Sequence, residues 1–230
     1  MQSIPPIGGH TVYRFELPLI HSNMYVVLCD NDALVVDSCL SGEAVALLQS
    51  SGVTRCTILL THEHYDHISG VNQLREHFSC TVICTEICAQ RMANPHRSHA
   101  AVFPAMFFSQ GPEVVRQAAA LFDTQYTCTA DETYTGTLNL QWHGIPLHLV
   151  ELSGHSPGSA AIEAAGTHVF TGDNLIPGTE TLIRLPGGDK TVYLDQVVPY
   201  LRRLPSSTVL LPGHGAWGYR ADPAVEAALP

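Results

Sequence analysis

Apolar residues occur along the chain in short runs, each followed by a segment that contains Gly, Pro, Asn or Asp. Runs rich in Val, Ile, Leu, Tyr and Phe with such boundaries are typical of β-strands. Ser41 is placed to cap a helix that Gly52 ends. Val71, Leu74 and Phe78 recur at helical spacing after His67. The first half is therefore predicted to contain strands at 11–17, 24–29, 33–37, 54–61 and 80–85, with helices at 42–51 and after His67.

The second half has the same arrangement of apolar runs that lead into loops, with strands predicted at 145–152, 167–172 and 207–211. Between the halves lies an Ala- and Phe-rich segment, in which Pro112 occupies the first position of a predicted helix. We therefore expect an α/β (α+β) fold in a single domain, residues 1–230, with a helical insertion at about 90–135. The apolar stripe of the insertion's helix is predicted to comprise Val114, Val115, Ala118, Leu121 and Phe122.

Histidine and aspartate gather where four of the predicted strands end. The sequence THEHYDH, residues 61–67, follows one strand directly. With 13 histidines in 230 residues, a His-x-His pair alone is expected by chance about 0.7 times, whereas the fuller spacing is expected about two times in a thousand. Ligand groups of α/β sheets collect at the carboxyl ends of strands. The candidate set is His62, His64, Asp66, His67, His155, Asp173 and His214.

Composition and charge narrow the function classes. A hydrophobic content of 45% with 14% charged residues indicates a globular protein, and no apolar run approaches the ~18 residues that a membrane span needs. The net charge of −10 disfavours nucleic acid as a partner. The first residues lack a basic segment followed by an apolar one, so we expect no secretory signal and a cytoplasmic location. The seven cysteines, including Cys80, Cys84 and Cys88, are expected to be reduced core residues.

Imidazole and carboxylate groups of this kind favour zinc, with iron or manganese as alternatives, over calcium or magnesium. Seven such groups are too many for one ion, so we expect two adjacent divalent ions that share one carboxylate. Two ions about 3.5–4 Å apart can hold a hydroxide between them and supply a nucleophile at neutral pH. Asp66 would accept a hydrogen bond from that hydroxide and orient it, which makes it the candidate catalytic residue. Hydrolysis of a small-molecule substrate is the predicted reaction.

The ordered motifs THEHYDHISG, GHSPGS, FTGD and LLPGHG resemble those of the metallo-β-lactamase-fold hydrolase superfamily, most closely its hydroxyacylglutathione hydrolase (glyoxalase II) branch. The resemblance extends from about residue 11 to 217 and implies a four-layer αβ/βα sandwich. It also implies that Asp173 bridges the ions and that Asp37 orients the metal ligands by contacting them on the side away from the ions. The ligand sets that it implies are His62, His64 and His155 for the first ion, and Asp66, His67 and His214 for the second.

The resemblance implies hydrolysis of a small carbonyl ester, with a thioester favoured. A lactonase would differ only in its pocket, and a persulfide dioxygenase would use a single iron on a His-His-Asp subset. A binding module without activity is the third class. β-Lactamases of the superfamily usually carry a cysteine where Asp173 stands, which disfavours β-lactam hydrolysis. Only 16 residues follow His214, so we expect no glutathione-binding helical domain, and whether glutathione is part of the substrate stays open.

Aromatic residues near the motifs are candidates for the substrate pocket. They are Tyr65, within the first motif, and Phe103, Phe107 and Phe108, in the insertion. The alternative for these side chains is the core or a contact in a homodimer. His96 and His99 have no partner motif, and we expect both to lie on the solvated surface.

Overall fold

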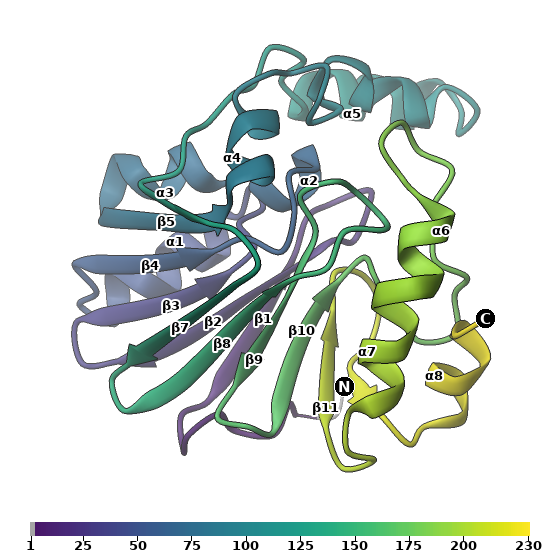
Figure 1. Ribbon diagram of the computed structural model, residues 1–230. Helices are drawn as coiled ribbons and strands as arrows, with labels where there is room; N and C mark the ends of the chain where they lie inside the picture. Colours follow the sequence, from purple (N-terminus) through teal and green to yellow (C-terminus); the bar gives the residue numbers. More distant parts are fainter. Residues whose placement is uncertain (1–2) are drawn as a thin grey trace.

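The computed structural model describes residues 3–230, whose strands form two six-stranded sheets (Figure 1). The first sheet follows chain order: β1 (Val12–Glu16), β2 (Asn23–Cys29), β3 (Asp32–Val36), β4 (Arg55–Leu59), β5 (Ser79–Thr85) and β6 (Glu132–Tyr134). The second sheet runs in the order β12 (Gly218–Tyr219), β11 (Val209–Pro212), β10 (His168–Gly172), β9 (Ala160–Ala164), β8 (Ile145–Glu151) and β7 (Thr137–Trp142).

Helices cover the outer faces of both sheets (Figure 1). The first half contributes α1 (Gly42–Ser50), α2 (Tyr65–Ile68), α3 (Val71–His77), α4 (Glu86–Met92), the 3₁₀ helix η1 (Ala100–Phe107) and α5 (Pro112–Leu121). The second half contributes α6 (Lys190–Val192), η2 (Tyr193–Val197), α7 (Val198–Arg203) and α8 (Pro223–Ala228). Ser41 caps α1 by accepting a hydrogen bond from the Ala44 amide, as the sequence predicted.

The alternation of side chains along each strand builds two separate cores around the first sheet. In β2, Met24 and Val26 face α1, α3 and α4, whereas Tyr25 and Val27 face the other sheet. Leu149 of β8 belongs to the core between the sheets. A third core joins the second sheet to α7 and α8. The layers are therefore helices, sheet, sheet and helices, which confirms the predicted αβ/βα sandwich.

Three strands of the second sheet and one of the first were not among the predictions. β7 and β9 extend the second sheet around the predicted β8, and β12 closes its opposite edge. The predicted insertion also ends differently: β6 lies within 90–135 and pairs with β5 in parallel. The helical part of the insertion therefore consists of η1 and α5 with their connections, and β6 belongs to the sheet.

The cysteines of the described chain are all free, as expected. Cys84 and Cys88 are buried, and Cys80 is half-buried. Over residues 3–230, no helix is both long enough and apolar enough to cross a membrane.

Candidate metal centre

The candidate ligands converge because they follow strands whose carboxyl ends meet at one edge of the two sheets. The loop after β4 and the short helix α2 carry His62, His64, Asp66 and His67. Asp173 follows β10 directly, and the remaining two histidines lie in the loops after β8 and β11. The structure thus brings together all seven side chains that the sequence predicted: His62, His64, Asp66, His67, His155, Asp173 and His214.

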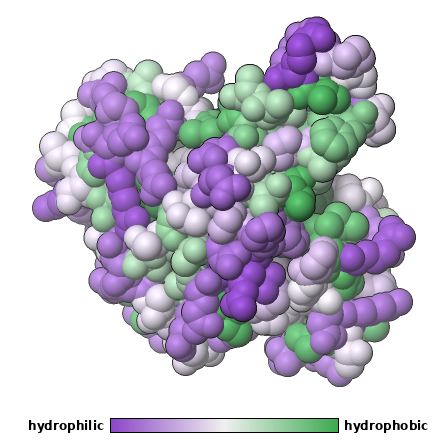
Figure 2. Space-filling model, turned by 90° about the horizontal axis from the view of Figure 1, so that it is seen from above, coloured by the Kyte–Doolittle hydropathy of each residue, from purple (hydrophilic) through white to green (hydrophobic). Residues whose placement is uncertain are grey.

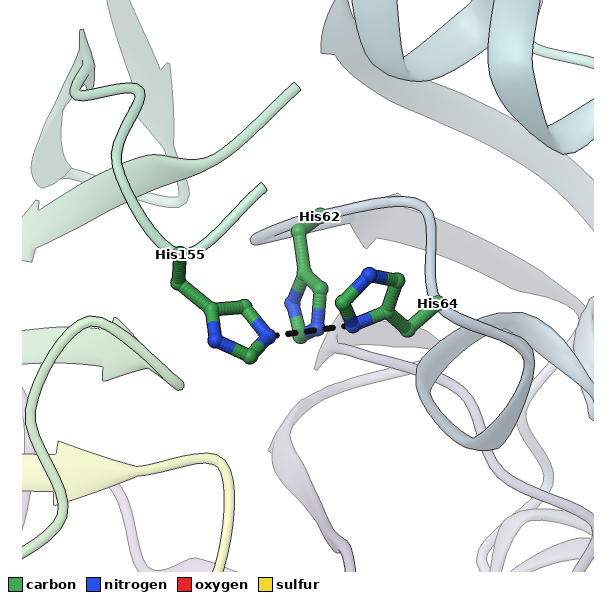
Figure 3. A group of neighbouring side chains, drawn as sticks. All are labelled: His62, His64 and His155. Atoms are coloured by element: carbon green, nitrogen blue, oxygen red, sulfur yellow. Dashed lines mark hydrogen bonds between the residues drawn. The ribbon is translucent and has the colours of Figure 1, made fainter. Parts of the chain in front are cut away.

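The first group consists of His62, His64 and His155, whose rings point toward one another from two separate loops (Figure 3). His155 Nε2 lies 3.0 Å from His64 Nδ1. His62 Nε2 is buried and has no hydrogen-bond partner among the described residues. A divalent ion would use these three nitrogens, and the orphaned His62 nitrogen is the kind of buried polar atom that a bound ion satisfies.

The second group consists of Asp66, His67 and His214. His214 Nε2 lies 3.3 Å from His67 Nε2 and 3.3 Å from Asp66 Oδ2. Asp173 lies beside both groups, with its carboxylate oxygens 3.5 Å from His67 Nε2 and 3.7 Å from His155 Nε2. A carboxylate at this position is able to bridge two ions, so the donor set fits a dinuclear centre.

In four of the candidate histidines, Nε2 faces the site and Nδ1 contacts an oxygen atom elsewhere in the protein. His67 Nδ1 contacts Asp37 Oδ2 at 3.0 Å, and His62 Nδ1 contacts Thr61 Oγ1 at 3.0 Å. His155 Nδ1 donates to the Leu182 carbonyl at 2.9 Å. His214 Nδ1 lies 3.3 Å from the carbonyl of residue 20. Such contacts fix the tautomer and turn Nε2 inward, as is usual for metal-binding histidine.

Asp37 organises the first motif from the end of β3, where its backbone adopts a φ of 55°. One oxygen accepts from the Thr61 amide at 2.7 Å, and the other accepts from the Thr61 hydroxyl at 2.8 Å. The second oxygen also contacts His67, so one buried carboxylate orients His67 directly and His62 through Thr61. The structure places Asp37 where the orienting role was predicted.

The protein shifts the pKa values of the two ligand groups in different ways. Burial, reinforced by neighbouring histidines, holds the pKa of His62 and His64 well below the usual value. Burial also opposes protonation of His214, but Asp173 and Asp66 outweigh it and raise the pKa of His214 to about 10. Burial would raise the pKa of Asp66, yet His67 and His214 hold it well below its usual range. The first group thus favours neutral imidazole and the second group holds an ionised carboxylate, which are the forms of these side chains that bind a metal ion.

Two glycines allow this close approach of backbone and ligands. A Cβ atom at Gly213 would lie 2.1 Å from Asp173 Oδ1 and 2.9 Å from His67 Cε1. At Gly172, which has a φ of 51°, a Cβ atom would meet the Thr61 hydroxyl at 2.5 Å. The glycine of the FTGD motif and the first glycine of the PGHG motif are therefore required by packing around the centre.

A cavity of about 490 Å³ opens beside the ligands. The view down onto the insertion shows apolar side chains around a hollow on this face (Figure 2). The lining includes His64, His155 and Asp173, together with Phe103 and Met106 of η1. The cavity therefore connects the predicted metal ligands to the insertion.

Only one of the four aromatic residues predicted for the pocket lines this cavity, namely Phe103. Tyr65 is fully buried and accepts a hydrogen bond from the Asp123 amide. Phe107 is 1% exposed and stacks on Phe122 in the core, whereas Phe108 is 70% exposed and lies outside the lining. These positions correct the pocket prediction for Tyr65, Phe107 and Phe108, because helix η1 turns Phe103 inward and Phe108 toward solvent.

His99 corrects a second prediction. His96 is exposed as expected, but His99 lines the cavity and stacks on His64 with ring centroids 4.5 Å apart. The His99 backbone has a φ of 67°, and burial lowers the pKa of its ring. Spacing along the chain gives no signal for this contact, since it depends on how the insertion folds back over α2.

Glu63 is a further site residue that the sequence motifs did not predict. The side chain lies between two ligands in the sequence and is fully buried. It binds Arg91 of α4 at 2.6 Å and accepts a hydrogen bond from Ser156 at 2.9 Å. Ser156 is adjacent to His155, so Glu63 connects both loops of the first group to the start of the insertion. The sequence offered one signal for Glu63, namely a charged residue between two predicted metal ligands.

Comparison with known proteins agrees with this geometry. The sequence profile of the metallo-beta-lactamase superfamily matches residues 17–214, and the chain belongs to that superfamily. Proteins of this superfamily are generally metal-dependent hydrolases that bind divalent ions.

Individual relatives are more distant. The probable metallo-hydrolase YqgX of Bacillus subtilis is 28% identical over 206 residues, which cover 88% of this chain and 89% of the relative. The hydroxyacylglutathione hydrolase GloC of Haemophilus influenzae is 25% identical over 203 residues, covering 82% of each chain. The crystal structure of the BLEG-1 B3 metallo-beta-lactamase superposes with a TM-score of 0.74 at 25% identity, covering 92% of this chain and 95% of the other.

Proposed function

We propose that the protein is a dinuclear metal hydrolase that cleaves a small carbonyl ester, with a thioester as the favoured substrate. The observation that carries this proposal is the pair of ligand groups on either side of Asp173, whose oxygens lie within 3.7 Å of nitrogens from both. Two divalent ions held there, with zinc favoured, would polarise the substrate carbonyl and lower the pKa of water toward 7.

The chain's own residues would position the reacting groups. Asp66 is 5% exposed, and its pKa is held well below the usual range, so the carboxylate is ionised at neutral pH. From this position the carboxylate can accept a hydrogen bond from the attacking water and orient it. The cavity beside His64 and His155 then holds the substrate with its carbonyl near the centre.

Support for a thioester comes from the similarity to GloC, whose name describes hydrolysis of a glutathione thioester. The similarity to BLEG-1 makes a β-lactam a necessary comparison substrate. A lactonase would use the same centre, because only the leaving group differs. A persulfide dioxygenase would need a single iron and would consume oxygen.

The test is a substrate panel on protein with a measured metal content. The panel contains thioesters, lactones, a β-lactam and a phosphodiester, with oxygen uptake followed on a glutathione persulfide. Thioester turnover that requires two ions and disappears in Asp66→Asn supports the proposal. Oxygen uptake by protein with one iron per chain overturns it, as does turnover of the β-lactam or phosphodiester alone.

A further inference from the structure

Apolar side chains form much of the wall of the cavity beside the metal centre. Val102 and Met106 of η1 contribute to it from one side, and Ile176, Leu182 and Leu185 contribute from the loop after Asp173. Val102, Met106 and Leu182 are also 56%, 49% and 43% exposed, so the apolar surface continues to the mouth of the cavity. Exposed apolar side chains that form one surface mark a binding site more often than scattered ones do.

Away from the metal ligands, the cavity offers a substrate no side chain with a fixed positive charge. Among the described residues that line it, none is lysine or arginine, and Glu180 adds a negative charge near the mouth. Arg184 is exposed and lies outside the lining, although its neighbour Leu185 belongs to it. A carboxylate held several bonds from the scissile carbonyl would therefore enter an apolar space without a cationic partner. Burial of an unpaired charge in such a space is strongly unfavourable.

We propose that the substrate group that fills this cavity is uncharged and apolar, such as an alkyl or aryl chain, and that acidic groups are excluded. The inference rests on the proposed ester hydrolysis and specifies its substrate class. Glutathione thioesters, which carry two carboxylates remote from the thioester bond, would accordingly be poor substrates. The volume of about 490 Å³ is within the roughly 300–1,000 Å³ usual for small-molecule sites.

The kinetic test uses two matched series on metal-loaded protein: one varies the acyl chain on an uncharged thiol, and the other varies the thiol on a fixed acyl group. In at least one series, kcat/KM should rise about fourfold per added methylene, which corresponds to about 0.8 kcal/mol. Butyryl and succinyl thioesters of one uncharged thiol have equal chain length and differ in a carboxylate. The succinyl ester should react on the order of 100-fold more slowly.

Variants test whether the dependence of kcat/KM on chain length arises in the cavity. Met106→Ala should reduce the gain per methylene, whereas Phe108→Ala is the matched control two positions away and should leave it unchanged, because Phe108 lies outside the lining. Glu180→Gln should narrow the gap between succinyl and butyryl esters a few-fold. The proposal is overturned if kcat/KM does not change with chain length in either the acyl series or the thiol series. Efficient succinyl turnover that Arg184→Ala removes also overturns it, since Arg184 would then be the carboxylate's partner.

A binding measurement separates this inference from the proposed reaction. The hexyl thioether of the same uncharged thiol cannot be hydrolysed. It should bind metal-free protein with a negative heat-capacity change in calorimetry. Met106→Ala should weaken that binding more than Phe108→Ala does. If the thioether binds but no ester is cleaved, the proposed reaction is wrong and the cavity's preference stands. If esters are cleaved but the thioether and its longer homologues do not bind, the inference is wrong.

Discussion

The ion pair between Glu63 and Arg91 should contribute strongly to stability, because it joins α4 to the two loops that carry the three ligands of the first group. Glu63 is fully buried and the Arg91 side chain is 18% exposed. Replacing Arg91 with Ala leaves the Glu63 carboxylate buried without its cation. Removal of one partner of a buried pair typically costs about 3–5 kcal/mol.

The Arg91→Ala loss should fall near the lower end of that range, about 3 kcal/mol, because Glu63 can take up a proton instead of remaining charged. Burial already raises the pKa of Glu63 in the intact protein, against the opposing effect of Arg91. Without Arg91 the pKa rises further. A carboxyl group whose pKa is raised on folding favours the folded state at low pH, and that advantage is lost as pH rises. The deficit of Arg91→Ala should therefore be smallest near pH 5 and grow toward pH 8.

The assay is urea unfolding at 25 °C of metal-free protein, so that metal binding does not add to the measured free energy. Glu63→Gln keeps the shape of the side chain and removes its charge. The double variant Arg91→Ala with Glu63→Gln should recover most of the loss, and the cycle should yield a coupling energy of about 2–3 kcal/mol. A loss below about 1 kcal/mol in Arg91→Ala, or a double variant no more stable than Arg91→Ala, would show that the Glu63–Arg91 pair contributes little to stability.

Three further outcomes are expected. His155→Ala should abolish turnover while circular dichroism stays unchanged, because the side chain lies in a loop and its loss opens no core cavity; retained activity without added metal would contradict the assigned site. Asp32→Asn should cost about 1–2 kcal/mol above pH 4, since the Arg55 hydrogen bonds lower the pKa of Asp32 to about 2. The Asp32→Asn deficit should shrink as pH falls from about 4 to about 2, and a deficit independent of pH would exclude the ion pair as its cause. Phe107→Ala should lose about 3–5 kcal/mol in unfolding experiments, whereas Phe108→Ala should change stability by less than about 0.5 kcal/mol; equal effects would contradict their opposite burial.

The sequence predicted the site better than it predicted the sheet edges. His62, His155, Asp173 and His214 each follow an apolar run, and the ends of such runs meet at one sheet edge whatever the path between them. β9 was missed because its sequence, AAIEA, has weak strand preference and is held in the sheet by β8 and β10. The residues of β7 do alternate, with Leu138 and Leu140 on one face, so its signal was present.

The pocket could not be predicted from residue type, because an aromatic side chain in a core and one in a cavity look alike in a sequence. Tyr65 lies between ligands but turns its hydroxyl toward the Asp123 amide. Phe103 and Phe108 are five residues apart on either side of a helical turn, and only Phe103 reaches the cavity. The position of His99 over His64 requires a left-handed backbone and the folded insertion together. Such contacts are set by tertiary packing, which the local pattern does not encode.

The proposed function depends on Asp173 joining the two ligand groups into one dinuclear centre. The most direct measurement is elemental analysis of the purified protein, followed by metal-free protein titrated with the same ion while turnover is recorded. We expect two ions per chain in the intact protein and maximal turnover only when both are bound. Asp173→Ala should retain no more than one ion at equal free-metal concentration. One ion per chain at full activity, and one iron in particular, would show that the centre is not dinuclear.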